Sequence, residues 1–359
     1  MDNDTGGIMV KHFFWLVLSL SGLALCGAAY FFWYITLDHR AADKATLSTI
    51  ESVVTDEPIT PIPLDLLLDE RKVSLGRRIF HDPRLSHDNT ISCAHCHSLA
   101  NGGMDGLPLS IGINGKMSKV NTPTVFNSGF NFRLFWDGRA ATLEEQIDFP
   151  LTNPDEMNSN WDEVLAKIGK DADYLSDFAD IYSEGIEPHT IKDAIATFER
   201  SLITPNSKFD RYLRGDKHAL DSAELAGYDL FKSFGCISCH QGMNVGGNLY
   251  EKFGIVNDYF SNRGHIQKSD FGRYNVTNIE SDRFQFRVPS LRNVAVTAPY
   301  FHDGSVSNLA GAVVIMGKYQ LGVDLREEEV ALIVKFLNAL TGEYDGEPLL
   351  VSTQSKALR

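Results

Sequence analysis

Two five-residue words constrain this chain more than any other feature of its sequence. The first is Cys93-Ala94-His95-Cys96-His97 and the second is Cys236-Ile237-Ser238-Cys239-His240. In each word, two thiols separated by two residues can add to the vinyl groups of one haem, and the histidine that follows can bind its iron. The words therefore predict two covalently bound c-type haems, one on Cys93, Cys96 and His97 and the other on Cys236, Cys239 and His240.

Other uses of a Cys-x-x-Cys pair fit these words less well. Such a pair can be half of a zinc site or a redox dithiol, and two pairs can share one metal ion. A histidine directly after the second cysteine, present in both words, is not what zinc ribbons or thioredoxin motifs show. The fifth cysteine, Cys26, is left over, so no disulfide framework is predicted.

Length and charge bound the remaining classes. A chain of 359 residues with 43% hydrophobic content exceeds what one core usually serves, which predicts two domains and an appendage. The formal net charge of -14 argues against a nucleic-acid partner. It also provides acidic surface that can steer a basic redox partner.

The N-terminal part contains a stretch that is long enough to cross a membrane. Residues 13–37 carry no charge and have aromatic residues at both ends, which predicts a transmembrane anchor. The alternative is a signal peptide cleaved near the small residues that follow Cys26. Because c-type haem is attached outside the cytoplasmic membrane of bacteria, the body is expected in the periplasm, anchored to the inner membrane.

Helical periodicity dominates the rest of the chain and predicts an all-α fold. Apolar residues recur at helical spacing over 64–80, 188–202 and 220–234, and a last helix is expected between a cap at Asp324, with Glu327 completing a capping box, and Gly342. The stretch 241–286 is expected to be loop with at most short strands. The expected organisation is a cytoplasmic segment 1–12, the anchor 13–37, a tether 38–63, haem domains 64–205 and 206–345, and a tail 346–359.

An internal repeat indicates that the two haem domains arose by duplication. One constant shift superposes Pro123 on Pro289, Asn127 on Asn293, Phe135 on Phe301, Asp137-Gly138 on Asp303-Gly304, and Leu143 on Leu309. Both halves also run in the same order: a helix, a haem word, an irregular loop, an aromatic-x-Asp-Gly turn and a second helix.

The differences between the two copies indicate where their chemistry diverges. An electron-transferring haem needs both axial positions filled, and Met316 is a candidate ligand, although methionine is more often core filler. A catalytic haem needs an open side and a group that moves protons, which Glu156 with Gln146 nearby could supply, although most glutamates are simply solvated. At the matched turn, the first copy has Trp136 and the second has His302.

Several separated motifs occur in a fixed order around the haem words. They are Asn121-Thr122-Pro123-Thr124-Val125, Phe135-Trp136-Asp137-Gly138-Arg139-Ala140, Glu156-Met157, Ala298-Pro299-Tyr300-Phe301-His302-Asp303-Gly304 and Ile315-Met316-Gly317. Together with the haem words, over roughly residues 64–342, they resemble the bacterial dihaem cytochrome c peroxidase family. The resemblance implies an enzyme that reduces hydrogen peroxide to water with electrons from a small cytochrome c or a cupredoxin.

The resemblance also implies the roles of the haem-site residues. His97 matches the proximal ligand of a peroxidatic haem, whereas His240 and Met316 match the two axial ligands of an electron-transferring haem. Glu156 matches the distal acid–base residue of the peroxidatic haem, and Gln146 matches its neighbour.

Further implied roles lie between the two haems. Trp136 matches an aromatic residue in the electron path. The resemblance implies a calcium ion at the domain interface, held by Asn121 and the backbone carbonyls of Thr297 and Pro299, with His302 near that interface. Family members are often dimers, so the resemblance also makes a homodimer an expectation.

Two departures from the family pattern affect the expected mechanism. Many members close the peroxidatic haem with a loop histidine, whose matching position here is Ile113, which leaves either an open haem or an unexpected ligand such as Met117. The N-terminal anchor makes a membrane quinol an alternative electron donor. Two rival functions follow: a dihaem oxidase that matures a protein-derived cofactor, whose second haem would carry Tyr where Met316 stands, and a non-catalytic membrane-tethered electron carrier.

Overall fold

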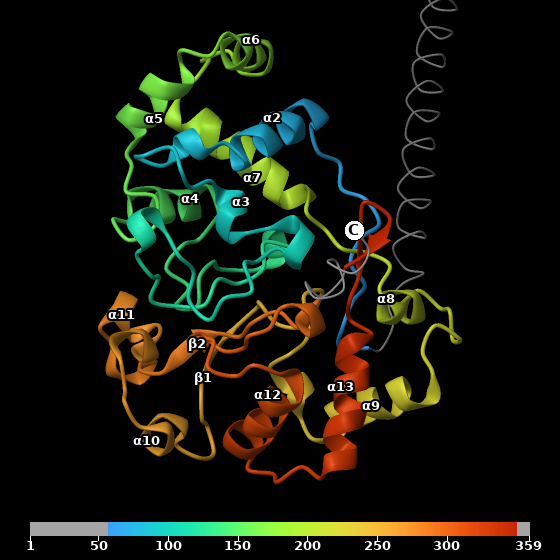
Figure 1. The fold of residues 1–359 in the computed structure, drawn as a ribbon. Helices are drawn as coiled ribbons and strands as arrows, with labels where there is room; N and C mark the ends of the chain where they lie inside the picture. The colour runs from blue at the N-terminus through green and yellow to red at the C-terminus, as the bar shows by residue number, and fades with distance from the viewer. Residues whose placement is uncertain (1–56, 350–359) are drawn as a thin grey trace, which may run out of the picture. The chain divides into compact units, whose positions relative to one another are not determined.

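The computed structural model describes residues 57–349, and most of their regular structure is helical, as predicted (Figure 1). The predicted anchor, residues 13–37, lies outside the described residues. Within 57–349, none of the helices combines the length and the apolar character that a membrane crossing requires.

The first lobe is built around the helices that carry the first haem word. Its core is formed by apolar residues between Val73 and Leu202. Its helices are α2 (Glu70–Phe80), α3 (Cys93–Cys96), α4 (Leu143–Thr152), α5 (Trp161–Ile168), α6 (Ala172–Ile181) and α7 (Pro188–Ser201). Helices α2 and α7 pack along each other as the central pair of this lobe (Figure 1).

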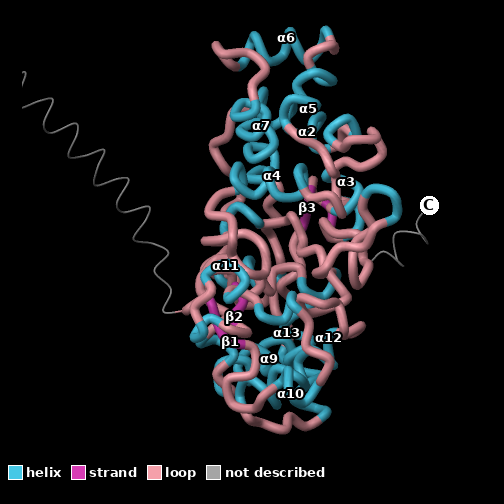
Figure 2. The backbone as a smooth tube through the Cα atoms, turned by 90° about the vertical axis from the view of Figure 1, so that its left-hand side faces the viewer, coloured by secondary structure: helices cyan, strands magenta, loops and turns pink. Residues whose placement is uncertain are grey.

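The second lobe repeats that plan with additions. Its core runs from Phe209 to Leu340 and also includes Ile59. Its helices are α8 (Lys208–Leu213), α9 (Ser222–Ser233), α10 (Tyr259–Arg263), α11 (Tyr274–Thr277), α12 (Leu309–Met316) and α13 (Glu327–Asn338), and β1 (Tyr250–Lys252) pairs antiparallel with β2 (Gln285–Arg287) (Figure 2). The stretch 241–286 therefore holds short helices as well as the short strands expected there.

Two details of the predicted helices were wrong. Helix α13 begins at Glu327, because the Glu329 carboxylate accepts the Arg326 backbone N–H over 2.9 Å, whereas Glu327 was expected to complete a capping box with Asp324. Helix α2 begins at Glu70, where the Asp69 carboxylate accepts the Arg71 backbone N–H, six residues later than the periodicity indicated.

The duplication is visible in how the helix pairs cross. In the first lobe, a Cβ on Gly76 of α2 would lie 1.9 Å from the carbonyl oxygen of Ala194 in α7. In the second lobe, a Cβ on Gly227 of α9 would lie 2.0 Å from the carbonyl oxygen of Leu332 in α13. Only glycine permits these backbones to touch, so both lobes depend on the same close crossing.

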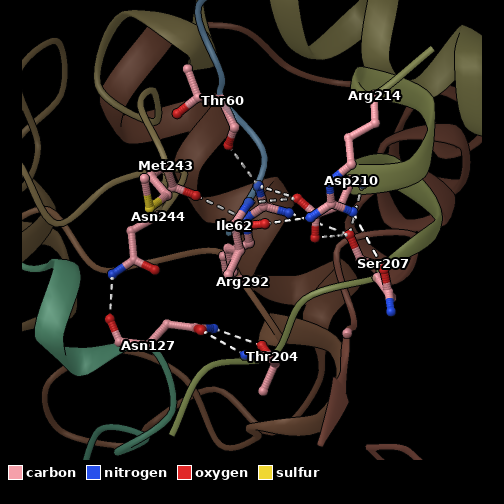
Figure 3. Close-up of polar contacts among 12 residues, drawn as sticks. Thr60, Ile62, Asn127, Thr204, Ser207, Asp210, Arg214, Met243, Asn244 and Arg292 are labelled. Carbon is pink, nitrogen blue, oxygen red and sulfur yellow. Dashed lines mark hydrogen bonds and ion pairs between the residues drawn. The ribbon is translucent and has the colours of Figure 1, made fainter. Parts of the chain in front are cut away.

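The two lobes meet where the repeated asparagines converge on one hydroxyl. The side-chain amides of Asn127 and Asn293 donate to Thr204 Oγ1 over 2.7 and 2.9 Å. The Thr204 N–H donates to Asn127 Oδ1 over 2.9 Å (Figure 3). The Gly342 N–H donates to Asn293 Oδ1 over 3.0 Å. Both asparagines have left-handed backbones, with φ of 59° and 61°, so the junction has local twofold pseudosymmetry.

Segments from both ends of the described chain tie the lobes together further. The buried Arg292 guanidinium ion-pairs with Asp210 at 2.9 Å and donates to the carbonyl oxygens of Met243 and Thr60 (Figure 3). Residues 57–63, expected to be part of a tether, thus pack on the second lobe, where Ile59 and Ile62 are fully buried. At the other end, β3 (Glu343–Tyr344) and β4 (Glu347–Pro348) form a hairpin that returns to the first core.

One position breaks the duplication inside the helix pairs. Glu199 in α7 occupies the place that Leu337 occupies in α13, and both side chains are buried. Burial raises the pKa of Glu199 to about 8, and Oε2 has no hydrogen-bond partner among the described residues. The first lobe therefore holds a carboxyl group that is protonated at neutral pH inside its core.

We expect the stability contributed by the Glu199 proton to be lost at alkaline pH. The folded-state pKa lies above the usual value of 4.5, so this stability is fully present below about pH 4.5 and disappears as the pH rises through about 8. The free energy of unfolding of the Glu199→Gln variant, measured with urea, should rise relative to that of the wild type between pH 5 and 9. The expected rise is about 1.4 kcal/mol for each unit of pKa shift. The exposed Glu184→Gln variant is the control, and parallel pH profiles of Glu199→Gln and wild type would contradict the assignment.

Candidate functional site

The two haem words occupy equivalent places in the two lobes. The first forms α3, and the second forms a single helical turn that follows α9. All four cysteines are half-buried and unpaired. Cys93 packs against the first core and Cys236 against the second, so each thiol pair faces apolar surface of the kind that a macrocycle requires.

Each word presents its histidine with one ring nitrogen already engaged. His97 Nδ1 lies 3.3 Å from the carbonyl oxygen of Gly103, and His240 Nδ1 lies 3.2 Å from that of Val245. Since a carbonyl only accepts, each Nδ1 carries the proton and Nε2 is left with a free lone pair. Burial lowers the pKa of both rings, that of His240 to about 4, so both are in the neutral form that binds iron. These residues fit one haem in each lobe.

The loop after the first haem word packs against the backbone of Glu156. The Ile113 N–H donates to the Glu156 carbonyl oxygen over 2.8 Å. A Cβ on Gly112 would lie 2.2 Å from the Asp155 carbonyl oxygen, so glycine is needed for this close approach. Ile113 is 1% exposed, whereas the Met117 side chain is 59% exposed. The side chain at the position of the family's closing histidine is therefore buried beside the candidate acid–base residue.

Glu156 is held in a partly buried position just after α4. Its Oε1 accepts from Asn153 Nδ2 over 2.8 Å, and its N–H donates to the Asn153 carbonyl oxygen over 3.0 Å. Burial raises the pKa of Glu156, and the positive charge of Arg139 partly opposes this shift. Gln146 is half-buried on α4, the helix that leads into this turn. Such a carboxyl group exchanges a proton closer to neutral pH than a solvated glutamate does.

Trp136 belongs to the first lobe but packs with aromatic residues of the second. Its Nε1 donates to the Asn121 carbonyl oxygen over 2.9 Å, and its carbonyl oxygen accepts from the Arg287 N–H over 2.8 Å. Its ring lies edge-on to the buried His302 ring, with 6.4 Å between centroids, and contacts the cluster around Phe286. The indole ring therefore bridges the two lobes.

Met316 is the last residue of α12 and is half-buried. The helix widens immediately afterwards into a π-turn at Gly317–Leu321, a departure that often accompanies functional sites. The thioether of Met316 thus lies at a backbone irregularity of the second lobe. This position suits an iron ligand, although many methionines are only packed in a core.

The residues expected to bind calcium offer oxygen atoms of the kind that calcium prefers. Asn121 is buried, and its Nδ2 donates to the carbonyl oxygens of Leu107 and Pro108 over 2.9 and 3.3 Å, which leaves Oδ1 as the available oxygen. Its N–H donates to the His302 carbonyl oxygen over 2.8 Å, which joins it to the segment that contains Thr297 and Pro299. One amide oxygen and two carbonyls are hard donors that fit Ca²⁺, although a full shell of six to eight oxygens needs further ligands.

The structure also contains a cluster of charged residues near Asn121 that the sequence did not predict. The buried Asp270 accepts from His302 Nε2 over 2.7 Å and pairs with Arg263, which also pairs with Asp303 at 2.6 Å. These hydrogen bonds lower the pKa of Asp270 to about 2, despite its burial. Because Arg263 pairs with both carboxylates, the cluster is an ion-pair network. Arg263 and Asp270 lie well before the adjacent His302 and Asp303 in sequence, so no local motif joins these two pairs of residues.

Comparison with known proteins agrees with this geometry. The sequence profile of the family described as "Di-haem cytochrome c peroxidase" matches residues 70–218. The "Cytochrome c peroxidase Ccp" of Escherichia coli (strain K12) is 51% identical over 290 residues, which are 80% of this chain and 62% of that relative. This chain thus spans less than two thirds of the length of that protein.

Two further matches cover most of both partners. The "Cytochrome c551 peroxidase" of Nitrosomonas europaea is 42% identical over 292 residues, which are 81% of this chain and 86% of the relative. The crystal structure of "a MauG-like protein associated with microbial copper homeostasis" superposes with a TM-score of 0.69 and 32% identity, over 79% of this chain and 93% of the other. These matches agree with the two haem words and the duplicated lobes of the present chain. The chain therefore belongs to the bacterial di-haem cytochrome c peroxidase family.

Proposed function

We propose that this protein reduces hydrogen peroxide to water, with two electrons and two protons consumed for each peroxide. The observation that carries the proposal is the partly buried Glu156 carboxyl group, whose backbone is braced by the loop that follows the first haem word. When bound, the two haems supply the redox chemistry, and the residues of the chain bind, orient and move protons.

Glu156 is proposed as the proton shuttle. Its carboxylate accepts a proton from one peroxide oxygen and delivers it to the other, so that the departing oxygen leaves as water. Asn153 holds Oε1 in place, and Gln146 on α4 is proposed to orient the peroxide. The raised pKa of Glu156 suits a group that must both take and give a proton.

The second lobe is proposed to supply electrons. His240 and Met316 are the residues that would hold its haem, and the family resemblance assigns the methionine this role. Trp136, packed between the lobes, provides the electron path to the first haem. The donor is a small cytochrome c or a cupredoxin, with a membrane quinol as the alternative, and the acidic surface suits a basic donor protein.

The first haem is proposed to remain open to peroxide in the fully oxidised protein. The loop that would carry a closing histidine has the buried Ile113 instead. Lys116 Nζ donates to the Pro154 carbonyl oxygen over 2.9 Å, and Lys116 and Lys119 both pair with Asp155, which supports a loop fixed in this position.

Location, assembly and calcium are finer proposals. We place the protein in the periplasm, anchored to the inner membrane by residues 13–37, because c-type haem is attached there. The homodimer remains an expectation from the family. Asn121 and the carbonyls of Thr297 and Pro299 are proposed to hold a calcium ion between the lobes.

The family resemblance implies one rival enzymatic function. An oxidase that matures a protein-derived cofactor would share the two-lobed fold. Met316, where the family resemblance places Tyr in such oxidases, favours the peroxidase.

Replacing Glu156 by Gln should remove the proton shuttle and leave the fold intact. We expect peroxide turnover with a reduced small cytochrome to fall by about 10²–10⁴-fold, the usual contribution of a general acid–base residue. The absorption spectra of both haems should stay nearly unchanged. Glu70→Gln, an exposed substitution on α2, is the control. Full turnover by Glu156→Gln would place the acid–base residue elsewhere.

Electron paramagnetic resonance of the oxidised protein tests whether the first haem is open. We expect one high-spin and one low-spin ferric signal, and peroxide turnover without prior reduction. Ile113→His should convert the high-spin signal to low spin, whereas Ile111→His, two residues away and 45% exposed, should not. Two low-spin signals in the wild type would support a closed enzyme or a simple electron carrier.

Removal of calcium should weaken the junction between the lobes. We expect one calcium ion per chain after dialysis against calcium-containing buffer, and chelation should lower the free energy of unfolding by about 3 kcal/mol if the ion had been present near a hundred times its dissociation constant. Readdition of Ca²⁺, but not of Mg²⁺, should restore stability. Absence of stoichiometric calcium by elemental analysis would refute the site.

A further inference from the structure

The two proximal histidines are held by loops that are built alike. In each lobe, the carbonyl oxygen that accepts the hydrogen bond from histidine Nδ1 also accepts one from a backbone N–H of a later segment. The Val125 N–H donates to the Gly103 carbonyl oxygen over 3.1 Å, and the Leu291 N–H donates to the Val245 carbonyl oxygen over 3.2 Å. The residue before that carbonyl is fixed by a hydroxyl group. Thr124 Oγ1 donates to the Gly102 carbonyl oxygen over 2.6 Å, and Ser290 Oγ donates to the Asn244 carbonyl oxygen over 2.8 Å. Gly102 and Asn244 therefore hold the same position relative to the carbonyl that accepts from the histidine.

The residue at this position differs between the lobes. In the first lobe it is Gly102, and a Cβ there would lie 2.8 Å from the Val296 carbonyl oxygen, so there is no room for a side chain. In the second lobe it is Asn244, whose side chain is 2% exposed. Its Nδ2 donates to the Asn127 carbonyl oxygen over 3.0 Å and to Asn131 Oδ1 over 2.9 Å (Figure 3). Both acceptors belong to the first lobe.

Only hydrogen bonds to the first lobe orient the Asn244 side-chain amide. Its Oδ1 has no hydrogen-bond partner among residues 57–349, so the two bonds of Nδ2 fix the side chain. Its acceptor Asn127 is immobilised by the lobe junction, where it is bonded to Thr204 and to the Leu202 carbonyl oxygen. Asn244 is thus a short strut between a rigid point of the first lobe and the loop of His240.

Hydrogen bonds connect the two ends of this strut to the loops that hold His240 and His97. On one side, Val245 follows Asn244 and its carbonyl holds His240 Nδ1. On the other side, Asn127 lies two residues after Val125, which shares the Gly103 carbonyl with His97 Nδ1. The hydrogen bond that a proximal histidine gives to a carbonyl sets its donor strength and, with it, the reduction potential of the iron.

We propose that Asn244 is a positioning residue through which the first lobe sets the hydrogen bond of His240, and thereby the reduction potential of the second haem. The role is directional, because Gly102 sends no side chain toward the second lobe. The inference rests on the proposed function only in that both sites hold haem.

Redox titration of the complete protein, followed by the absorption of each haem, tests this role. Asn244→Ala removes both hydrogen bonds without adding a charge. We expect it to weaken the His240 bond and raise the potential of the second haem, enough to change the equilibrium constant for electron sharing between the haems at least about threefold, well within what a change in the hydrogen bond of a ligating histidine achieves. The potential of the first haem should stay unchanged, as should both potentials in Asn248→Ala, an exposed asparagine of the same loop.

A second variant keeps the test decisive if Asn244→Ala does not fold. Asn131→Ala, in the first lobe, removes one acceptor of the strut and should shift the second-haem potential in the same direction by a smaller amount. Unchanged second-haem potential in folded Asn131→Ala and Asn244→Ala, or equal shifts of both haems, would overturn the proposal. Peroxide turnover is measured separately, so a wild type without peroxidase activity would refute the proposed function and leave this result standing.

Discussion

The convergence of Asn127 and Asn293 on the Thr204 hydroxyl is the contact on which the arrangement of the two lobes depends. Both buried amides donate to that hydroxyl group, and the backbone N–H groups of Thr204 and Gly342 donate to the two amide oxygens. Leaving any of these groups unpaired would cost about 1–3 kcal/mol each, so the junction tolerates one geometry. Electron transfer between two sites needs such a fixed geometry.

The junction is symmetric, whereas the sites on either side of it are not. The same duplicated framework carries Trp136 opposite His302, Glu199 opposite Leu337, and Gly102 and Asn244 before the two histidine-binding carbonyls. Glu199 and Asn244 each place a buried polar side chain in one lobe only. The framework therefore forms two equivalent haem-binding lobes. Glu199 adds a protonated carboxyl group to the core of the first lobe, and Asn244 links the histidine loop of the second lobe to the first.

Local sequence predicted those features that depend on local contacts. The haem words, the last helix, whose Val330, Ile333 and Leu337 are buried, and the repeated turns followed from spacing alone. Helix starts were less well predicted, because several groups near a helix start can cap it: Glu329 accepts the Arg326 N–H, whereas Glu327 was expected to pair with Asp324. Leu67, which lies within the predicted helix 64–80, is fully exposed because the helix begins after it.

The sequence by itself determined that this chain carries two c-type haem words, a duplicated helical framework and the motifs of its family, because covalent attachment and helical packing use short, regular spacings. Only the tertiary structure decided which distant groups meet. Ile113 packs on the Glu156 backbone, Asn244 donates to Asn127, and Arg263 pairs with both Asp270 and Asp303. Contacts of this kind are selected by burial and hydrogen-bond satisfaction in the folded chain, and they leave no period or motif along the sequence.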